Sequence, residues 1–311
     1  MRFLKIIIIV CFFAGVSCNK KIDLTQNTFD VVATGNTYKA GDTTNFLFFG
    51  NPDVITFYSG EIGRRYQFRN RVSDTSTNLQ LKFSTATTVA TSGSLSLLVS
   101  NNYSGVKDST NIYNATWTDI TARATLATGT ATVASGTISL TDFAQQQKPV
   151  YIAFKYSAAA AATQRKWTIT ALTLNHVISD TTYTITDLTL TAPAAYPSYT
   201  ASTGWTAANI RNTAINWTPT TSTSATTSLV ITGATTTTAA VATEDWIIAG
   251  PIDLTRVIPD GGIVVKDITQ QKTNYSYQYL RPGSYTATFF SANANRDRQD
   301  TLTRSINLTV K

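Results

Sequence analysis

Apolar and polar residues alternate along much of the chain in short runs, which is the pattern of half-buried β-strands. Residues 79–84, 94–100 and 167–174 show the alternation clearly. Threonine, valine and tyrosine, whose side chains fit a pleated surface, are frequent throughout. Turn-forming stretches such as Asn51-Pro52-Asp53 separate the runs. The pattern predicts an all-β protein.

The two ends of the chain carry complementary parts of one sandwich. Tyr277, residues 282–289 and residues 305–310 resemble the last three strands of a PKD-type immunoglobulin-like (Ig-like) domain, whose first strands are missing just before them. Residues 29–60 have the pattern of those first strands. Because domain termini often lie close together, a second domain can be inserted between them. We therefore expect an Ig-like sandwich built from both termini, residues 28–75 plus 268–311.

The predicted insert, residues 76–267, has a strand pattern of its own. Its runs resemble, in the same order, the galactose-binding-like jelly rolls of secreted bacterial modules with various anchors. A strand like residues 245–254 usually precedes the others in those modules, so the order here is permuted. Residues 191–243 are a low-complexity segment rich in threonine and alanine, for which we expect exposed strands and loops.

The N-terminus has the features of an export signal. Arg2 and Lys5 precede an uncharged apolar run, residues 6–14, which is too short to span a membrane. The small residues before Cys18 resemble the lipobox of bacterial lipoproteins, which implies a signal peptide of residues 1–17, acylation of Cys18 and a tether over residues 18–27. An ordinary signal peptide with an incidental cysteine is the alternative. Lipid on Cys18 would make the membrane a partner without a spanning helix.

Residues 29–310 as a whole resemble a Bacteroidota lipoprotein family catalogued as domain of unknown function 5017. Residues 38–42, 50–61 and 244–247 carry the resemblance. It implies an outer-membrane location, with polysaccharide or oligosaccharide and the transporter components of Sus-type glycan-uptake systems as partners. A cell-surface position is expected, whereas Lys20 and Lys21 after the cysteine keep a periplasm-facing anchor open.

The residue types that catalysis needs are scarce. His176 is the only histidine, which removes most catalytic triads and zinc sites, and it lies in a strand-like run that favours a structural role. Asp53, Glu61, Asp245 and Asp253 could serve a glycosidase, but the sequence gives no separation between any two. We expect no enzyme activity, no cofactor and no metal site, with calcium in the loops left open.

The formal charge of +7 is dispersed, and no Lys/Arg tract predicts nucleic-acid binding. A local basic group, Arg64, Arg65, Arg69 and Arg71, follows Glu61. For this group a solvated face and a bridge between the two domains both remain open.

Aromatic residues give the better functional argument, because sugar rings stack on tryptophan and tyrosine. Trp117, Trp167 and Trp246 lie in alternating runs and are expected in the core. Trp205 stands in a stretch punctuated by proline and glycine, which we interpret as a loop. The preferred ligand patch joins it to its neighbours in sequence, Tyr199, Asn209, Arg211 and Trp217. Tyr103 and Tyr113 form a second candidate; packing of the Trp205 loop onto the sandwich is the alternative.

The sequence thus favours a non-catalytic, lipid-anchored glycan-binding accessory of a Sus-type system. The alternative is a structural or adhesive interaction module of the outer membrane with no sugar affinity.

Overall fold

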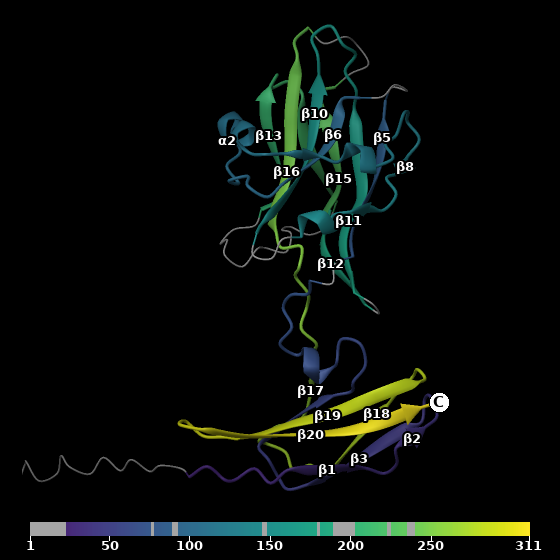
Figure 1. The fold of residues 1–311 in the computed structure, drawn as a ribbon, viewed down its shortest axis with the longest axis vertical. Helices are drawn as coiled ribbons and strands as arrows, with labels where there is room; N and C mark the ends of the chain where they lie inside the picture. The colour runs from purple at the N-terminus through teal and green to yellow at the C-terminus, as the bar shows by residue number, and fades with distance from the viewer. Residues whose placement is uncertain are drawn as a thin grey trace, which may run out of the picture. The chain divides into compact units, whose positions relative to one another are not determined.

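The computed structural model confirms the all-β expectation, with strands organised in several mainly antiparallel sheets (Figure 1). It describes residues 23–75, 78–88, 93–144, 148–178, 181–188, 203–222, 225–234 and 240–311. Cys18, the signal segment and Tyr199 lie outside these residues. The chain divides into two compact units: a terminal unit of Met1–Arg69 with Asp260–Lys311, and an inserted unit of Asn70–Pro259. The predicted borders, 75/76 and 267/268, lie a few residues beyond these.

The terminal unit is a sandwich of two sheets. The smaller sheet has the order β1-β3-β18 and the larger β17-β4-β19-β20-β2, with β2 parallel to β20 and the other pairs antiparallel. The strands are β1 (Asp30–Ala33), β2 (Thr37–Tyr38), β3 (Thr43–Phe49), β4 (Val54–Tyr58), β17 (Ile263–Lys266), β18 (Asn274–Gln278), β19 (Gly283–Ala294) and β20 (Gln299–Val310).

Alternation along these strands creates the terminal core. In β3, Phe46 and Phe48 are buried whereas Leu47 and Phe49 face solvent, as a period of two requires. The buried rings meet across the sandwich, and the centroid of Phe289 in β19 lies 4.9 Å from that of Phe46 and 4.8 Å from that of Phe57 in β4. This aromatic core joins residues from both ends of the chain.

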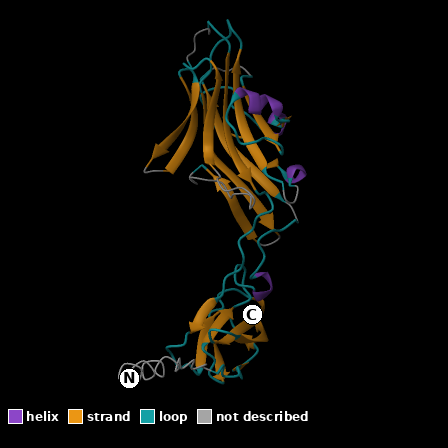
Figure 2. Cartoon of the chain, turned by 90° about the vertical axis from the view of Figure 1, so that its left-hand side faces the viewer, coloured by secondary structure: helices purple, strands orange, loops and turns teal. Residues whose placement is uncertain are grey.

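The inserted unit is a second two-sheet sandwich (Figure 2). One sheet has the order β13-β16-β10-β6-β7; the other has the order β14-β15-β11-β5-β8, with β12 and β9 paired to β11 and β5. The strands are β5 (Leu79–Thr87), β6 (Leu95–Ser100), β7 (Thr118–Asp119), β8 (Val133–Ala134), β9 (Ile138–Ser139), β10 (Val150–Ala158), β11 (Trp167–Ile178), β12 (Thr181–Asp187), β13 (Thr203–Arg211), β14 (Asn216–Ser222), β15 (Ala225–Thr232) and β16 (Thr243–Ile252).

One helix, α2 (Ser109–Asn114), is the single α-helix of the described residues, and the 3-10 turns are η1 (Tyr66–Phe68), η2 (Thr121–Arg123) and η3 (Thr141–Phe143). Asp108 caps α2 by accepting a hydrogen bond from Asn111 N at 2.7 Å. Ile112 of α2 packs on the outer face of the first sheet, against Trp246 and Tyr151. The helix therefore covers apolar residues that the sandwich core does not enclose. No helix in the described ranges has the length and apolar character to cross a bilayer.

The interpretation of the Trp205 stretch as a loop is wrong. Trp205 lies in β13, which pairs with β16 through Thr206 opposite Ile248 and Ala208 opposite Trp246. Pairing with a strand that follows about forty residues later decides the conformation here, and no local signal carries that information. The described part of the low-complexity segment, for which strands and loops were expected, contains β13 to β15.

Candidate functional site: the Tyr285 hollow

The loop that follows β4 crosses the start of β19. Gly60 has φ +86°, and a Cβ built on it would lie 2.8 Å from both N and O of Thr286. Only glycine combines this backbone conformation with so close an approach. The close contact fixes the path of the loop that carries Glu61 and Arg64.

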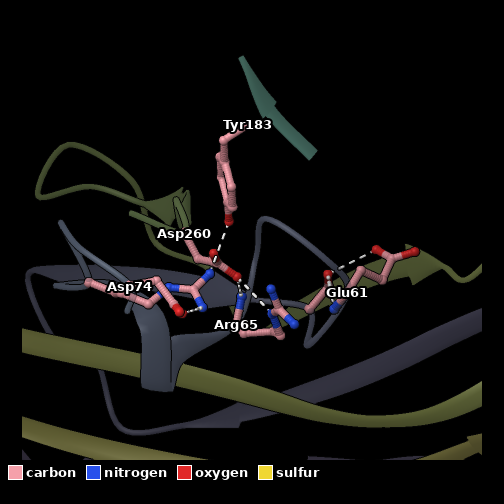
Figure 3. A network of polar contacts seen from close by, with 7 residues as sticks. Glu61, Arg65, Asp74, Tyr183 and Asp260 are labelled. Carbon is pink, nitrogen blue, oxygen red and sulfur yellow. Dashed lines mark hydrogen bonds and ion pairs between the residues drawn. The ribbon is translucent and has the colours of Figure 1, made fainter. Parts of the chain in front are cut away.

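A buried carboxylate holds the same loop from its other side. Asp260 Oδ2 accepts hydrogen bonds from the backbone N of Arg65 at 2.9 Å and from its Nε at 3.0 Å (Figure 3). The Asp260 side chain is fully buried, and Gly261 N donates to Gly63 O at 2.9 Å. Hydrogen bonds between a buried carboxylate and a guanidinium group form only over a narrow range of distances and angles. The Arg65–Asp260 pair therefore keeps the loop in one conformation.

Tyr66 closes the loop onto the sheet. Its ring lies edge-on to Tyr58, with centroids 5.2 Å apart, and stacks on Phe290 at 6.4 Å. The guanidinium of Arg69 lies 3.9 Å from the Tyr66 ring centroid. Residues 60–68 are therefore a rigid platform, which suits a binding site better than a mobile loop would.

Glu61 projects from this platform toward a row of tyrosines. Its Oε2 accepts hydrogen bonds from Ser59 Oγ at 2.8 Å (Figure 3) and from the Tyr277 hydroxyl at 2.5 Å. Burial, and next the hydrogen bond to Glu61, raise the pKa of Tyr277, so this hydroxyl stays a donor at neutral pH. Tyr279 donates to Ser59 O at 2.9 Å and so supports the same arrangement.

An open hollow of about 320 Å³ lies beside Glu61; we call it the Tyr285 hollow, and it is lined by Glu61, Ile62, Arg64, Arg281 and Tyr285. The Tyr285 ring stacks on Tyr279 with centroids 4.6 Å apart and planes at 27°. Its hydroxyl donates to Arg281 O at 2.8 Å, which orients the ring. The hollow thus combines an aromatic side chain with one carboxylate and two guanidinium groups.

Two further hollows of about 350 Å³ each lie nearby: one shares Tyr285 with the first hollow, and the other shares Ser284 and Thr286 with the second. Hydroxyl and amide groups dominate their lining, and Thr286 Oγ1 donates to Asn307 Oδ1 at 3.0 Å. We call this surface the hydroxyl face; it consists of Asn36, Thr37, Ser284, Thr286, Thr288, Ser305, Asn307 and Thr309. It offers donors and acceptors of the kind that match sugar hydroxyls.

The preferred sequence-based patch is not an exposed platform. Trp205 is 8% exposed and packs on Phe154 of the core, and Trp217 is 2% exposed. Their rings belong to the interior of the sandwich and leave no free face for a ligand. Tyr103 is also buried; its hydroxyl donates to Val106 O, and burial raises its pKa to about 12.

The structure does bring together two other predicted residues. Tyr113 is 55% exposed, and its hydroxyl donates to Glu244 Oε1 at 3.1 Å, an oxygen that Lys155 Nζ approaches within 3.4 Å. Arg211 lies opposite Glu244 in the register of β13 and β16. Asn209 instead binds Ile215 O through its Nδ2 at 3.2 Å and stabilises the turn between β13 and β14.

The carboxylates considered for glycosidase chemistry have structural contacts. Asp53 Oδ2 accepts from Ala294 N at 3.1 Å, and Asp253 Oδ1 accepts from Thr255 N at 2.9 Å, so each stabilises a turn or strand end. Among the residues that the structure describes, no three His, Cys, Asp or Glu side chains gather as metal ligands. His176 is buried in β11.

The stability of the inserted unit should depend on pH through Asp245. It is fully buried; its Oδ2 accepts from Trp217 N at 2.6 Å, and its Oδ1 has no hydrogen-bond partner among the described residues. Burial raises its pKa from 3.8 to about 7. Between these values the folded unit binds a proton that the unfolded chain has lost, so the contribution to stability is complete below about pH 4 and disappears as the pH rises through about 7. We expect Asp245→Asn to remove most of this loss.

The measurement is urea unfolding from pH 4 to pH 8, followed by tryptophan fluorescence. All five tryptophans lie in the inserted unit, so the signal reports that unit alone. A variant whose free energy of unfolding falls with pH as steeply as that of the natural chain would show that another group titrates.

Comparison with known proteins gives one family. The profile of the family described as domain of unknown function, DUF5017, matches residues 17–195. No curated protein and no solved structure matches the chain. The matched segment contains β1 to β4, the Gly60–Phe68 loop with Glu61, and the inserted unit as far as β12. Since the match covers more than half of the sequence, the chain belongs to the DUF5017 family.

Proposed function

We propose that the protein is a lipid-anchored, non-catalytic oligosaccharide-binding protein of the bacterial cell envelope, with the Tyr285 hollow and the hydroxyl face as its binding surface. The observation that carries the proposal is the juxtaposition of a fixed aromatic ring and charged groups in one open hollow, with a row of hydroxyls on the other face of the same strand, β19. Sugars need this combination, because their C–H faces pack on aromatic rings while their hydroxyls form hydrogen bonds at the rim.

The location rests on the N-terminal sequence. The small residues before Cys18 resemble a lipobox, and the family match begins beside them at residue 17. Acyl chains on Cys18 would hold the folded units at an outer membrane, where a role beside a Sus-type transporter of Bacteroidota fits a protein that binds glycan without cleaving it.

The test is affinity electrophoresis of the chain from residue 19 onward in gels that contain plant, host or microbial polysaccharides. We expect retardation by at least one polysaccharide, and Tyr285→Ala to weaken it at least about tenfold, since stacking on one ring contributes about 1–2 kcal/mol. Circular dichroism and thermal unfolding establish that the variant is folded.

Tyr113→Ala is the matched control, because Tyr113 is an exposed tyrosine of the other unit with its hydroxyl bound to a carboxylate. It should bind like the natural chain. Loss of binding in Tyr113→Ala alone would move the sugar site to the cluster around Glu244, and no retardation across the panel would contradict glycan binding.

The second function, an interaction module without sugar affinity, is supported by one surface. Val32, Leu47 and Phe49 are 44%, 42% and 54% exposed on the outer face of the β1-β3-β18 sheet, and Val32 lies opposite Leu47 in the register. Neighbouring exposed apolar residues are common at protein contacts. This function becomes the preferred one if no polysaccharide retards the chain.

A further inference from the structure

We propose that the Tyr285 hollow takes an acidic sugar, whose carboxylate or sulfate group is bound by Arg64 and Arg281. This inference rests on the proposed function and specifies the class of sugar. It follows from the charges that line the hollow and from which of them are already neutralised inside the protein.

Arg64 and Arg281 have no charge partner among the residues that the structure describes. Three other arginines of the terminal unit are engaged: Arg65 binds Asp260, Arg304 binds Asp30 at 3.1 Å, and Arg69 lies over Tyr66. Within the described chain, the guanidinium groups of Arg64 and Arg281 form neither an ion pair nor a side-chain hydrogen bond, although both line the same hollow. Two arginines without an ion pair therefore line one hollow, and oxyanions are the groups that guanidinium groups bind best.

Glu61 does not cancel this charge by pairing with either arginine. Its Oε2 takes the hydroxyls of Ser59 and Tyr277, which hold the carboxylate on the tyrosine side of the hollow. No other acidic residue lines the Tyr285 hollow or the two hollows of the hydroxyl face, so the lining is net positive. The other oxygen of Glu61 takes no part in these two bonds; in the proposed complex it accepts a sugar hydroxyl, which selects a sugar over a simple inorganic anion.

The residues around the two arginines offer further contacts to a glycan. The Tyr285 ring, fixed by Tyr279 and by its bond to Arg281 O, offers an apolar surface beside the two guanidinium groups. The hydroxyl face follows β19 and β20 on the opposite side of β19 from the Tyr285 ring and presents Ser284, Thr286 and Asn307. A neighbouring neutral unit of the glycan would have to pass the edge of β19 to reach the hydroxyl face.

The experiment measures the affinity of the chain from residue 19 onward for polygalacturonate, for its fully methyl-esterified form, and for alginate and chondroitin sulfate. Methyl esterification removes the charge while keeping the sugar backbone. We expect at least one acidic polymer to bind, with a dissociation constant at least about tenfold higher for Arg64→Gln/Arg281→Gln, on the scale of two partly exposed charge-assisted contacts. Binding should also weaken as salt rises from 50 to 500 mM.

The matched control is Arg296→Gln/Arg298→Gln, which removes the same charge from the exposed β19–β20 turn of the same unit. Equal weakening in this control would overturn the inference, because it would reduce the effect to net charge. Binding of neutral polymers with none of the acidic ones would overturn the inference and leave the proposed function standing. Binding of no polymer, neutral or acidic, would overturn both. Preference for chondroitin sulfate over unsulfated chondroitin would assign the anionic group as sulfate.

Discussion

Trp205→Ala is expected to lower the free energy of unfolding of the inserted unit by about 3–5 kcal/mol, because truncation of a buried tryptophan leaves a large cavity in the core. Trp205 packs on Phe154, which in turn contacts Phe83 across the sandwich at 5.1 Å between ring centroids. The sequence-based reading predicts the opposite outcome, an unchanged stability and a lost ligand. Urea unfolding followed by the fluorescence of the remaining tryptophans distinguishes the two.

Trp205→Phe provides a sharp control. The indole Nε1 of Trp205 is buried and has no hydrogen-bond partner among the described residues, so phenylalanine loses no hydrogen bond and fills much of the same space. We expect a cost of about 1–2 kcal/mol, well below that of alanine. A folded Trp205→Ala variant with undiminished stability and no polysaccharide affinity would return the ligand site to β13 and contradict the core assignment.

The all-β fold and the joining of both termini could be predicted because each rests on local alternation and turn chemistry. The alternation along β3 and β19 is explicit in the sequence, and so is the turn before β4. The family block that ends at Glu61 also marks the loop now seen at the candidate site. For these features local sequence and tertiary structure agree.

The Tyr285 hollow could not be predicted, because its lining comes from the two ends of the chain. Glu61 and Arg64 are separated from Arg281 and Tyr285 by more than two hundred residues, and their proximity depends on the pairing of β4 with β19. The local basic group gave a weak signal, yet its members have different roles: Arg65 is clamped by Asp260, whereas Arg64 lines the hollow. Only the fold separates the structural arginine from the exposed one.

The prediction that Trp205 lies in a loop was wrong for a related reason. Few large apolar residues surround Trp205 in sequence, so its stretch has the composition of a loop. The pairing of β13 with β16 places the ring over Phe154 nevertheless. A threonine- and alanine-rich segment has few large side chains to bury, so a tryptophan within it is one of those that enter the core. The lack of large apolar neighbours in sequence therefore did not indicate that Trp205 is exposed.

Asp260→Ala is expected to destabilise the terminal unit by about 2–4 kcal/mol and to loosen the loop that carries Glu61 and Arg64. The substitution leaves the backbone N–H of Arg65 without its acceptor and its guanidinium, 17% exposed, without its counter-charge. Hydrogen exchange of residues 60–68 should become faster, and affinity for any polysaccharide bound at the Tyr285 hollow should fall with it. The terminal unit contains no tryptophan, so its stability is measured by exchange of β4 and β19 amides.

Asp30→Ala is the control for this substitution, because Asp30 pairs with Arg304 in the same unit but both side chains are largely exposed, at 59% and 41%. An exposed pair contributes less than about 1 kcal/mol, so exchange of residues 60–68 should remain as in the natural chain. Unchanged protection of the loop in Asp260→Ala would mean that Gly60 against Thr286 and Tyr66 against Phe290 hold the loop by themselves. Faster exchange with undiminished polysaccharide affinity would instead separate the binding site from the loop.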